Sequence, residues 1–391
     1  MPSTSYSATP PPWKLALEPQ SDARLEAVLT RPGSQPVHTW FECLGRRLLP
    51  PEELDPFIAA VLPMPLRAEG AVHVAGTLTR EVVRNLIDAS EGWEDWNVDR
   101  YTALRISADR IIDPPVPTFS RRAAFAWSGS LRSTHTLVRH YARSVPGGVQ
   151  VGRIVHVIGL QGYARTISAD AIAAEVNKHA ERLGATVACV VTNAREIGLV
   201  EAEIGVLPVV AAALHLAATD LKLAFHARRW PFSAQLRYPR PEPAFPDVFC
   251  GSRMLIRADG GATTPTQMVR EVYEHAPFLL AAISGCSERP RFTAPCGDCS
   301  GCIITLLAFA AAGTAHPALP LPTVIDVERL QWSDPIVAAE ATEIASDWST
   351  AGSRVHQALR RRVERDRANA GSVEVRRWLA SATGLGPIWP R

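Results

Sequence analysis

Lysine is almost absent from this sequence. Of its 41 basic residues, only Lys14, Lys178 and Lys222 are lysines, and all the others are arginines. An anionic ligand must therefore be held mostly by guanidinium groups and backbone amides. A GC-rich coding bias accounts for the same shortage equally well. A strong excess of positive charge is also lacking, because the net charge at pH 7 is only +2, and this gives no signal for nucleic-acid binding.

Segments that direct a protein to or through a membrane are lacking as well. Residues 1–13 are rich in serine, threonine and proline and have no basic stretch followed by an apolar one. Residues 302–325 carry no charged group, but Gly313, His316 and three prolines interrupt them, which predicts a buried helix followed by a loop. We therefore expect a cytoplasmic protein with no membrane partner.

The length of 391 residues exceeds what one hydrophobic core usually organises, so two or three domains are expected. The segment Asp113-Pro-Pro-Val-Pro117 is typical of a stiff linker between domains. We expect a disordered tail over residues 1–12, a small N-terminal α+β accessory domain over 13–117, a central domain over 118–325 and a helical C-terminal extension over 326–391.

Apolar strand-like runs alternate with helical spacing after residue 117. This alternation predicts an α/β fold in which a doubly wound parallel sheet is covered by helices on both faces. The expected strands are 13–17, 37–41, 71–74, 123–127, 154–158, 186–191 and 222–225, and the expected helices are 79–89 with Thr79 as the cap, 133–141, 169–183, 207–218, 265–275, 346–368 and 373–379.

Four of the seven cysteines form one C-x9-C-x2-C-x2-C cluster, namely Cys286, Cys296, Cys299 and Cys302. Two C-x2-C steps put three thiolates on a tight knuckle at the start of a helix, and a fourth thiolate completes a tetrahedral all-sulfur site of the kind that zinc prefers. An iron–sulfur cluster is the main alternative, because closely spaced cysteines serve both. A closed four-cysteine site leaves no open coordination position, so we expect a structural Zn²⁺.

A second pattern lies at the first strand-to-helix turn of the central domain. Ser128, Gly129, Ser130 and Ser133 are small residues at the start of a helix, where backbone amides and the helix dipole attract an anion. In a doubly wound sheet, such loops at the carboxyl ends of strands hold the ligand. The residues suit a phosphate cradle, whereas the simpler interpretation makes Ser133 only the N-cap of the helix.

Together the two patterns resemble a known family. Ser128-Gly-Ser-Leu-Arg-Ser133 is similar to the S-G-G-x-D-S loop of PP-loop ATPases, the N-type ATP pyrophosphatases. The cysteine cluster, followed by Thr305-Leu-Leu-Ala-Phe309, resembles the ending of their 7-cyano-7-deazaguanine synthase branch, called QueC-like. Val157-Ile-Gly-Leu-Gln161 and Val191-Thr-Asn-Ala-Arg195 resemble the segments after the second and third strands of that family, so the resemblance covers about residues 123–313.

The resemblance implies a PP-loop (HUP-like) fold and an AMP-forming reaction. Family members use ATP and Mg²⁺ to activate a carboxylate, in this branch that of a 7-deazapurine, for ligation or for nitrile or amide formation. Relatives also occur in bacterial anti-phage operons, which implies partner proteins from the same operon and a small-molecule or protein substrate. By this resemblance the catalytic residues are Ser128, Arg132 and Ser133, and the ATP-binding residues are Ser128, Gly129, Ser130, Ser133, Gly159 and Gln161.

The sequence departs from the family pattern at charged positions. Ser130 replaces the second loop glycine, Arg132 stands at the acidic loop position, and Gln161 replaces the acid after the second strand. Residues 264–268 also lack the lysine of the family's downstream segment. Loss of both acids removes the obvious protein ligands of Mg²⁺, while Arg132 predicts stronger attraction of an anion. Two hypotheses follow: an enzyme in which arginine neutralises part of the charge, or a catalytically inactive QueC-like nucleotide- or nucleobase-binding subunit of a multi-protein system.

Overall fold

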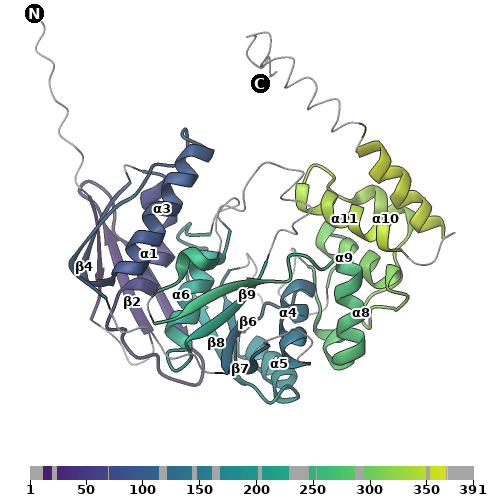
Figure 1. Cartoon of the computed structure of the whole chain (residues 1–391), viewed down its shortest axis with the longest axis horizontal. Coiled ribbons are helices and arrows are strands. Elements are labelled where there is room, and N and C mark those ends of the chain that lie inside the picture. Colours follow the sequence, from purple (N-terminus) through teal and green to yellow (C-terminus); the bar gives the residue numbers. More distant parts are fainter. Residues whose placement is uncertain are drawn as a thin grey trace, which may run out of the picture.

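The structure is a computed structural model, and its overall arrangement is shown in Figure 1. It describes residues 12–19, 24–68, 70–113, 121–142, 148–160, 168–200, 205–228, 246–251, 253–286, 295–348, 353–366 and 368.

Ten strands make one continuous sheet, in the order β10-β9-β6-β7-β8-β3-β2-β1-β4-β5. Six of the nine neighbouring pairs are parallel, and the three antiparallel pairs are β8–β3, β3–β2 and β2–β1. The strands are β1 (Trp13–Leu17), β2 (Arg24–Thr30), β3 (Val37–Cys43), β4 (Ala71–Thr79), β5 (Arg105–Ile112), β6 (Arg122–Ala126), β7 (Gln150–Ile158), β8 (Thr186–Thr192), β9 (Leu223–Ala227) and β10 (Leu255–Asp259).

The parallel part that contains β6 to β10 has a defined winding. The chain passes from β6 through β7 to β8, then crosses to the other side of β6 and continues with β9 and β10. Counted along the chain this is the order 3-2-1-4-5, whose direction reverses between β6 and β9. The prediction of an α/β protein with a largely parallel sheet flanked by helices is therefore confirmed.

Helices cover both faces of the sheet. Because side chains alternate along a strand, neighbouring residues such as Ala124 and Phe125 enter two different apolar clusters. One cluster includes α1 (Asp55–Val61), α2 (Pro63–Leu66), α3 (Arg80–Trp96) and α6 (Leu207–Ala217). The other includes α4 (Leu131–Tyr141), α5 (Ala169–Glu181), α8 (Pro265–His275), α9 (Ser300–Ala311), α10 (Val324–Arg329) and α11 (Pro335–Asp347), and most of these helices gather at one end of the molecule in Figure 1.

The N-terminal strands continue the same sheet as the central ones. Phe41, Glu42 and Cys43 of β3 pair with the end of β8. Beyond the last pair, the Asn193 side chain accepts a hydrogen bond from the Trp40 amide (3.1 Å) and donates one to the His38 carbonyl (2.8 Å). The structure thus connects residues 13–112 to the central strands through backbone and side-chain hydrogen bonds, while the domain boundary at residue 117 stays a prediction.

The C-terminal helices differ from the sequence expectation. Instead of one helix over 346–368, α11 ends at Asp347 and a separate helical stretch covers 354–366. Apolar residues of this region, among them Val337, Ile344 and Leu359, belong to the same buried cluster as α4 and α8. The predicted helix at 373–379 lies outside the described residues.

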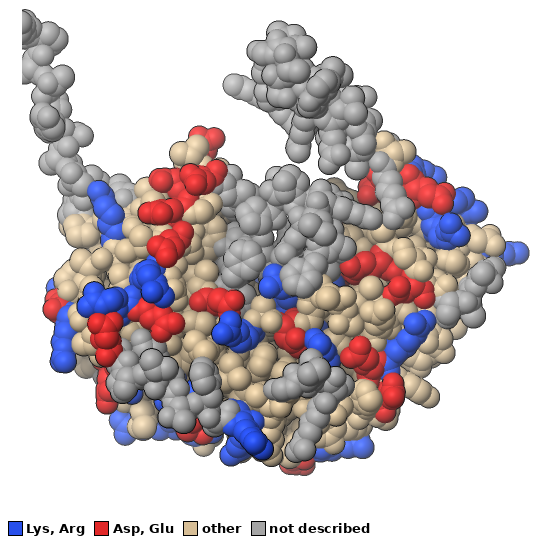
Figure 2. Space-filling view, in the orientation of Figure 1, with Lys and Arg blue, Asp and Glu red and all other residues tan. Residues whose placement is uncertain are grey.

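Charges of both signs are interspersed on the face drawn in Figure 2, where the described Lys and Arg residues lie among Asp and Glu. This agrees with the near-zero net charge of +2. In the described ranges, no helix is both long and apolar enough to span a bilayer.

Candidate metal centre and ligand-binding loop

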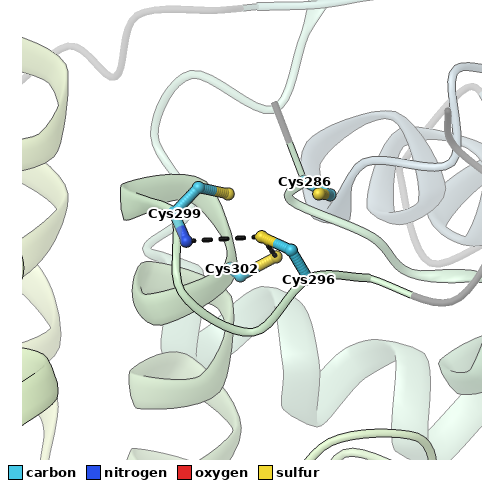
Figure 3. A group of neighbouring side chains, drawn as sticks. All are labelled: Cys286, Cys296, Cys299 and Cys302. Carbon is cyan, nitrogen blue, oxygen red and sulfur yellow. Dashed lines mark hydrogen bonds between the residues drawn. The ribbon is translucent and has the colours of Figure 1, made fainter. Parts of the chain in front are cut away.

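The four cysteines of the C-x9-C-x2-C-x2-C cluster come together. All four sulfur atoms lie within 4.8 Å of one another, and the Sγ atoms of Cys296 and Cys302 are 3.8 Å apart. In Figure 3, Cys286 faces the other three from a separate segment of the chain. The group could hold a metal ion, as the sequence predicts.

The spacing of the sulfur atoms fits one tetrahedral ion. With a zinc–sulfur bond of about 2.3 Å, the sulfurs of a tetrahedral site lie about 3.8 Å apart. A polynuclear iron–sulfur cluster inserts several irons between the cysteines and needs a wider separation of the sulfurs. The arrangement therefore favours a single ion and is consistent with zinc.

The crowding of the thiols points to a cation as well. Hydrogen bonding with Cys299, followed by burial, raises the pKa of the Cys302 thiol well above its ordinary value. Burial raises the pKa of Cys296 too. These two thiols thus resist ionisation by themselves, whereas a bound Zn²⁺ stabilises thiolates.

Local backbone geometry shapes the knuckle. Gly297 has φ +84°, in the left-handed region that glycine adopts without strain, and the Cys299 amide donates to the Cys296 sulfur at 3.4 Å. Cys299 is the N-cap residue of α9, so Cys302 lies in the first turn of that helix. There the positive end of the helix dipole stabilises a thiolate.

Cys286 reaches the knuckle because two glycines permit close backbone contact. A Cβ on Gly285 would lie 2.1 Å from the Gly301 carbonyl oxygen, and a Cβ on Gly301 would lie 2.0 Å from the Gly285 carbonyl oxygen. Only glycine at both positions lets the segment before Cys286 cross the first turn of α9 at this distance. The segment is also fixed by His316, whose ring nitrogen Nε2 lies 2.9 Å from the Ile283 carbonyl oxygen.

The serine-rich loop follows β6 directly. Gly129 adopts φ +75°, and the hydroxyl oxygens of Ser128, Ser130 and Ser133 lie 3.0 to 3.2 Å from one another. The N-cap of α4 is Ser130, whose side chain accepts a hydrogen bond from the Ser133 amide, so the interpretation of Ser133 as the N-cap is wrong. The three hydroxyls and the helix N-terminus form one polar surface that suits an anion.

The loop occupies the edge of the sheet where ligands are expected. It follows β6, the strand beside which the winding direction changes, and the Trp127 amide still pairs with the Val155 carbonyl of β7 (3.0 Å). The carboxyl ends of β6 and β7 therefore lie side by side. In doubly wound sheets, ligands bind outside the carboxyl ends of the strands where the strand order reverses, here between β6 and β9, and the loop after β6 borders that point.

Arg132 does not leave an uncompensated positive charge at the loop. Its Nε and Nη2 atoms donate to Oε1 of Glu340 on α11 at 2.8 and 2.6 Å, and both side chains are mostly buried. The expectation that Arg132 attracts an anion more strongly is thus opposed by a carboxylate 208 residues later in the chain. The Nη1 atom of Arg132 is buried and has no hydrogen-bond partner among the described residues.

Gly159 lies at the carboxyl end of β7, but its immediate neighbour is β8. A Cβ at this position would lie 2.0 Å from the Thr192 carbonyl oxygen, and φ is +100°. Packing between strands is therefore sufficient to require glycine here. Nearby, Nη1 of Arg195 donates to the Leu160 carbonyl at 3.0 Å, which joins the segments after β7 and β8. The remaining predicted ATP-binding residue, Gln161, lies outside the described residues.

A buried polar cluster between α4, β10 and α8 was not expected from the sequence. Arg139 donates to Asp259 at 2.8 Å, and His135 lies 2.9 Å from a carboxylate oxygen of Glu271. Burial lowers the pKa of His140, whose Nε2 atom is 3.8 Å from Asp259. The helical spacing of these residues on α4 was the only sequence signal, because Asp259 and Glu271 follow more than a hundred residues later.

A shallow hollow on the described surface lies elsewhere. Its volume is about 460 Å³, and it is lined by residues that include Lys14, Arg31 and His73 of the N-terminal strands. It contains neither the serine loop nor the cysteines.

Comparison with known proteins gave no match: no family model, no curated protein and no solved structure matches this chain.

Proposed function

We propose that this chain is a QueC-like PP-loop protein that binds ATP at the loop after β6 and carries a structural Zn²⁺ at its four cysteines. In this proposal the protein activates a carboxylate, such as that of a 7-deazapurine or of a protein substrate, by forming an acyl adenylate for later ligation or nitrile or amide formation. The cytoplasm is the compartment that supplies both ATP and reduced thiols. Partner proteins from one operon, and a role in anti-phage defence, belong to the same proposal.

The observation that carries the proposal is the position of the Ser128–Ser133 loop. It combines three converging hydroxyls and a helix N-terminus with the edge of a parallel sheet beside the reversal of strand order. The strand order 3-2-1-4-5 supports it further, because it places the loop beside the reversal, and the convergence of the four sulfurs agrees with the cysteine motif on which the resemblance rests.

The chemistry assigns simple roles to the residues of the loop. An oxygen of the substrate carboxylate attacks the α-phosphorus of ATP, the bond from this phosphorus to the bridging oxygen breaks, and pyrophosphate leaves with the electron pair. Loop amides and the hydroxyls of Ser128 and Ser133 would hold the departing pyrophosphate and stabilise its charge. A nitrogen nucleophile then displaces AMP from the activated carboxyl group.

The loop offers no carboxylate to Mg²⁺, because Arg132 occupies the acidic position and pairs with Glu340. Its residues therefore do not fit a metal ion held by the protein.

A second candidate function is a catalytically inactive subunit that binds a nucleotide or nucleobase at the same loop. The Arg132–Glu340 pair favours it, because the family's loop acid is replaced and the replacement is already engaged by a carboxylate. Binding without turnover separates this candidate from the first.

The experiment tests binding and turnover together. ATP binding to the zinc-loaded protein is measured by calorimetry, and AMP and pyrophosphate are measured by phosphorus NMR after incubation with ATP, Mg²⁺ and a 7-carboxylated 7-deazaguanine. Ser130→Ala should weaken ATP binding, whereas the matched Ser168→Ala, which removes the N-cap of α5 outside the loop, should leave it unchanged.

Each outcome has one meaning. AMP formation supports the enzyme, and ATP binding without AMP supports the inactive subunit. Absence of any ATP binding, or an equal effect of the two serine substitutions on it, contradicts both the enzyme and a nucleotide-binding subunit.

A further inference from the structure

The segment from Ile283 to Cys286 joins the cysteine cluster to the serine loop. The Ser284 amide donates a 2.8 Å hydrogen bond to the carbonyl oxygen of Gly129, the central glycine of the loop. Two residues later Cys286 supplies one of the four sulfurs, and its amide donates to the Ser284 hydroxyl at 3.3 Å. The two sites are therefore separated by one residue, Gly285.

Each residue of this segment is held by close contacts or by burial. The Ile283 carbonyl contacts His316, Gly285 is in close backbone contact with Gly301, and Cys286 and Ser284 are both buried. Gly301 lies between Cys299 and Cys302 in the first turn of α9, so the metal site and the segment share the same helix end. Gly285 is packed tightly against the backbone of Gly301. If Cys286 moves, the backbone of Gly285 and Ser284 must therefore move with it.

We propose that Ser284 is a positioning residue through which metal occupancy sets the conformation of the loop after β6. A bound ion fixes the Cys286 sulfur against the other three, and this fixes the Ser284 amide under the Gly129 carbonyl. Without the ion, four neighbouring thiols lose the cation that holds them together, and Gly129 loses its anchor. The inference rests on the proposed function in that it makes the affinity of the loop for a phosphate ligand depend on zinc.

Thermodynamic linkage makes the dependence reciprocal. If zinc raises the affinity of the loop for pyrophosphate by some factor, then pyrophosphate must raise the affinity for zinc by the same factor. A zinc whose loss merely unfolds the chain obeys the same equality, so the inference requires weaker binding in a protein that is still folded and still holds its zinc.

Two substitutions of Ser284 separate the backbone contact from the side chain. Ser284→Pro removes the amide proton that bonds to Gly129, and Ile283 has φ −72° and ψ 121°, a conformation that tolerates a following proline. Ser284→Ala keeps the amide and removes the hydroxyl, which accepts a hydrogen bond from the Cys286 amide. Neither substitution removes a cysteine.

The test uses the full-length chain with zinc bound and with zinc removed by a chelator. Affinity for inorganic pyrophosphate is measured by calorimetry, and zinc content by elemental analysis. We expect Ser284→Pro to retain zinc and to bind pyrophosphate about three- to tenfold more weakly, as the loss of one hydrogen bond implies, while Ser284→Ala behaves like the unsubstituted protein.

Removal of zinc by the chelator should weaken pyrophosphate binding to the unsubstituted protein by a comparable factor. It should have little further effect on pyrophosphate binding in Ser284→Pro. An unchanged affinity in zinc-loaded Ser284→Pro overturns the inference.

Hydrogen exchange of residues 128–133 provides a readout that needs no ligand. The inference predicts faster exchange of this loop in Ser284→Pro and after chelation, but not in Ser284→Ala. If the loop exchanges faster yet pyrophosphate does not bind to any form, the coupling stands and the proposed function fails. If exchange of the loop is the same in all forms, the coupling is refuted whether or not pyrophosphate binds.

Discussion

Gly159 and Gly184 are two glycines with left-handed backbone but different surroundings. Gly184 has φ +64° and open space around its Cβ position, whereas a Cβ on Gly159 would overlap the Thr192 carbonyl oxygen at 2.0 Å. A non-glycine residue is strained at both sites, by about 1 to 2 kcal/mol in the left-handed helical conformation of Gly184. Only Gly159 adds a steric clash between the ends of β7 and β8.

Substitution by alanine should therefore affect the two positions unequally. We expect Gly184→Ala to lower the free energy of unfolding by about 1 to 2 kcal/mol and Gly159→Ala to lower it by about 2 to 5 kcal/mol. Chemical denaturation of both variants checks this. Equal losses would mean that the close contact with Thr192 is not present in solution.

The cysteine knuckle at the start of α9 is the element whose stability we expect to depend on a bound metal ion, because its four cysteines could hold one. Replacement of Cys302, which is buried in the first turn of α9, should reduce the zinc content from about one ion per chain and lower the free energy of unfolding by several kcal/mol. Cys43 is a matched control, because it is buried in β3 outside the cluster. Elemental analysis should find full zinc content in Cys43→Ser and reduced content in Cys302→Ser; no zinc in the unsubstituted protein would contradict the assignment.

Helix α11 contacts the N-terminal ends of α4 and α8 through polar side chains. Glu340 pairs with Arg132 of α4, and Asp347 accepts a hydrogen bond from Thr264, the N-cap of α8. We expect Arg132→Ala and Glu340→Ala each to lower the free energy of unfolding by about 1 to 3 kcal/mol, because each leaves a mostly buried partner unpaired. The double variant should lose clearly less than the sum of the two. Additive losses in a double-mutant cycle would show that the pair does not couple the helices.

Sequence patterns predicted those elements whose apolar spacing is regular. The strands at 13–17, 154–158 and 186–191 and the buried helix after Cys302 were found, since their side chains enter the two apolar clusters. β2 was missed although Leu25, Ala27 and Leu29 alternate with less buried residues, a period-two signal that was available. β5 lies at the sheet edge and exposes most of its side chains, so it carries little apolar signal.

The candidate site was only partly predictable for a related reason. Spacing alone brings Cys296, Cys299 and Cys302 together, because they are close in sequence. The pairing of Arg132 with Glu340 joins residues 208 positions apart, and the bond from Ser284 to Gly129 depends on how the chain returns to the loop. No local pattern encodes such contacts, which follow from the packing of whole elements.

At the scale of the whole molecule, buried histidines predict loss of stability in acid. Burial lowers the pKa of His226 to about 4, compared with about 6.5 when exposed, and it also lowers the pKa values of His140, His179, His215 and His316. Between these pH values the unfolded chain binds more protons than the folded one, so stability falls as the pH falls from about 6.5 towards 4. His226 alone contributes on the order of 1 to 3 kcal/mol to this loss.

A substitution isolates this contribution from other effects of acid, such as the release of zinc. His226→Gln removes the titrating group and keeps a polar side chain of similar size. The difference in unfolding free energy between pH 7 and pH 4.5 should be smaller in this variant than in the unsubstituted protein. Equal pH dependence in both would mean that His226 titrates normally in the folded state.

The central claim is that the loop after β6 is where a nucleotide binds, and hydrogen exchange with and without ATP tests it most directly. The account predicts that ATP slows exchange of residues 128–133, at the N-terminus of α4, and of the adjoining end of β7. The amide exchange rates of the residues that line the hollow, Lys14, Thr30, Arg31 and His73, should not change. Protection of that hollow with none at the loop, or no protection by ATP at any site, would contradict the account.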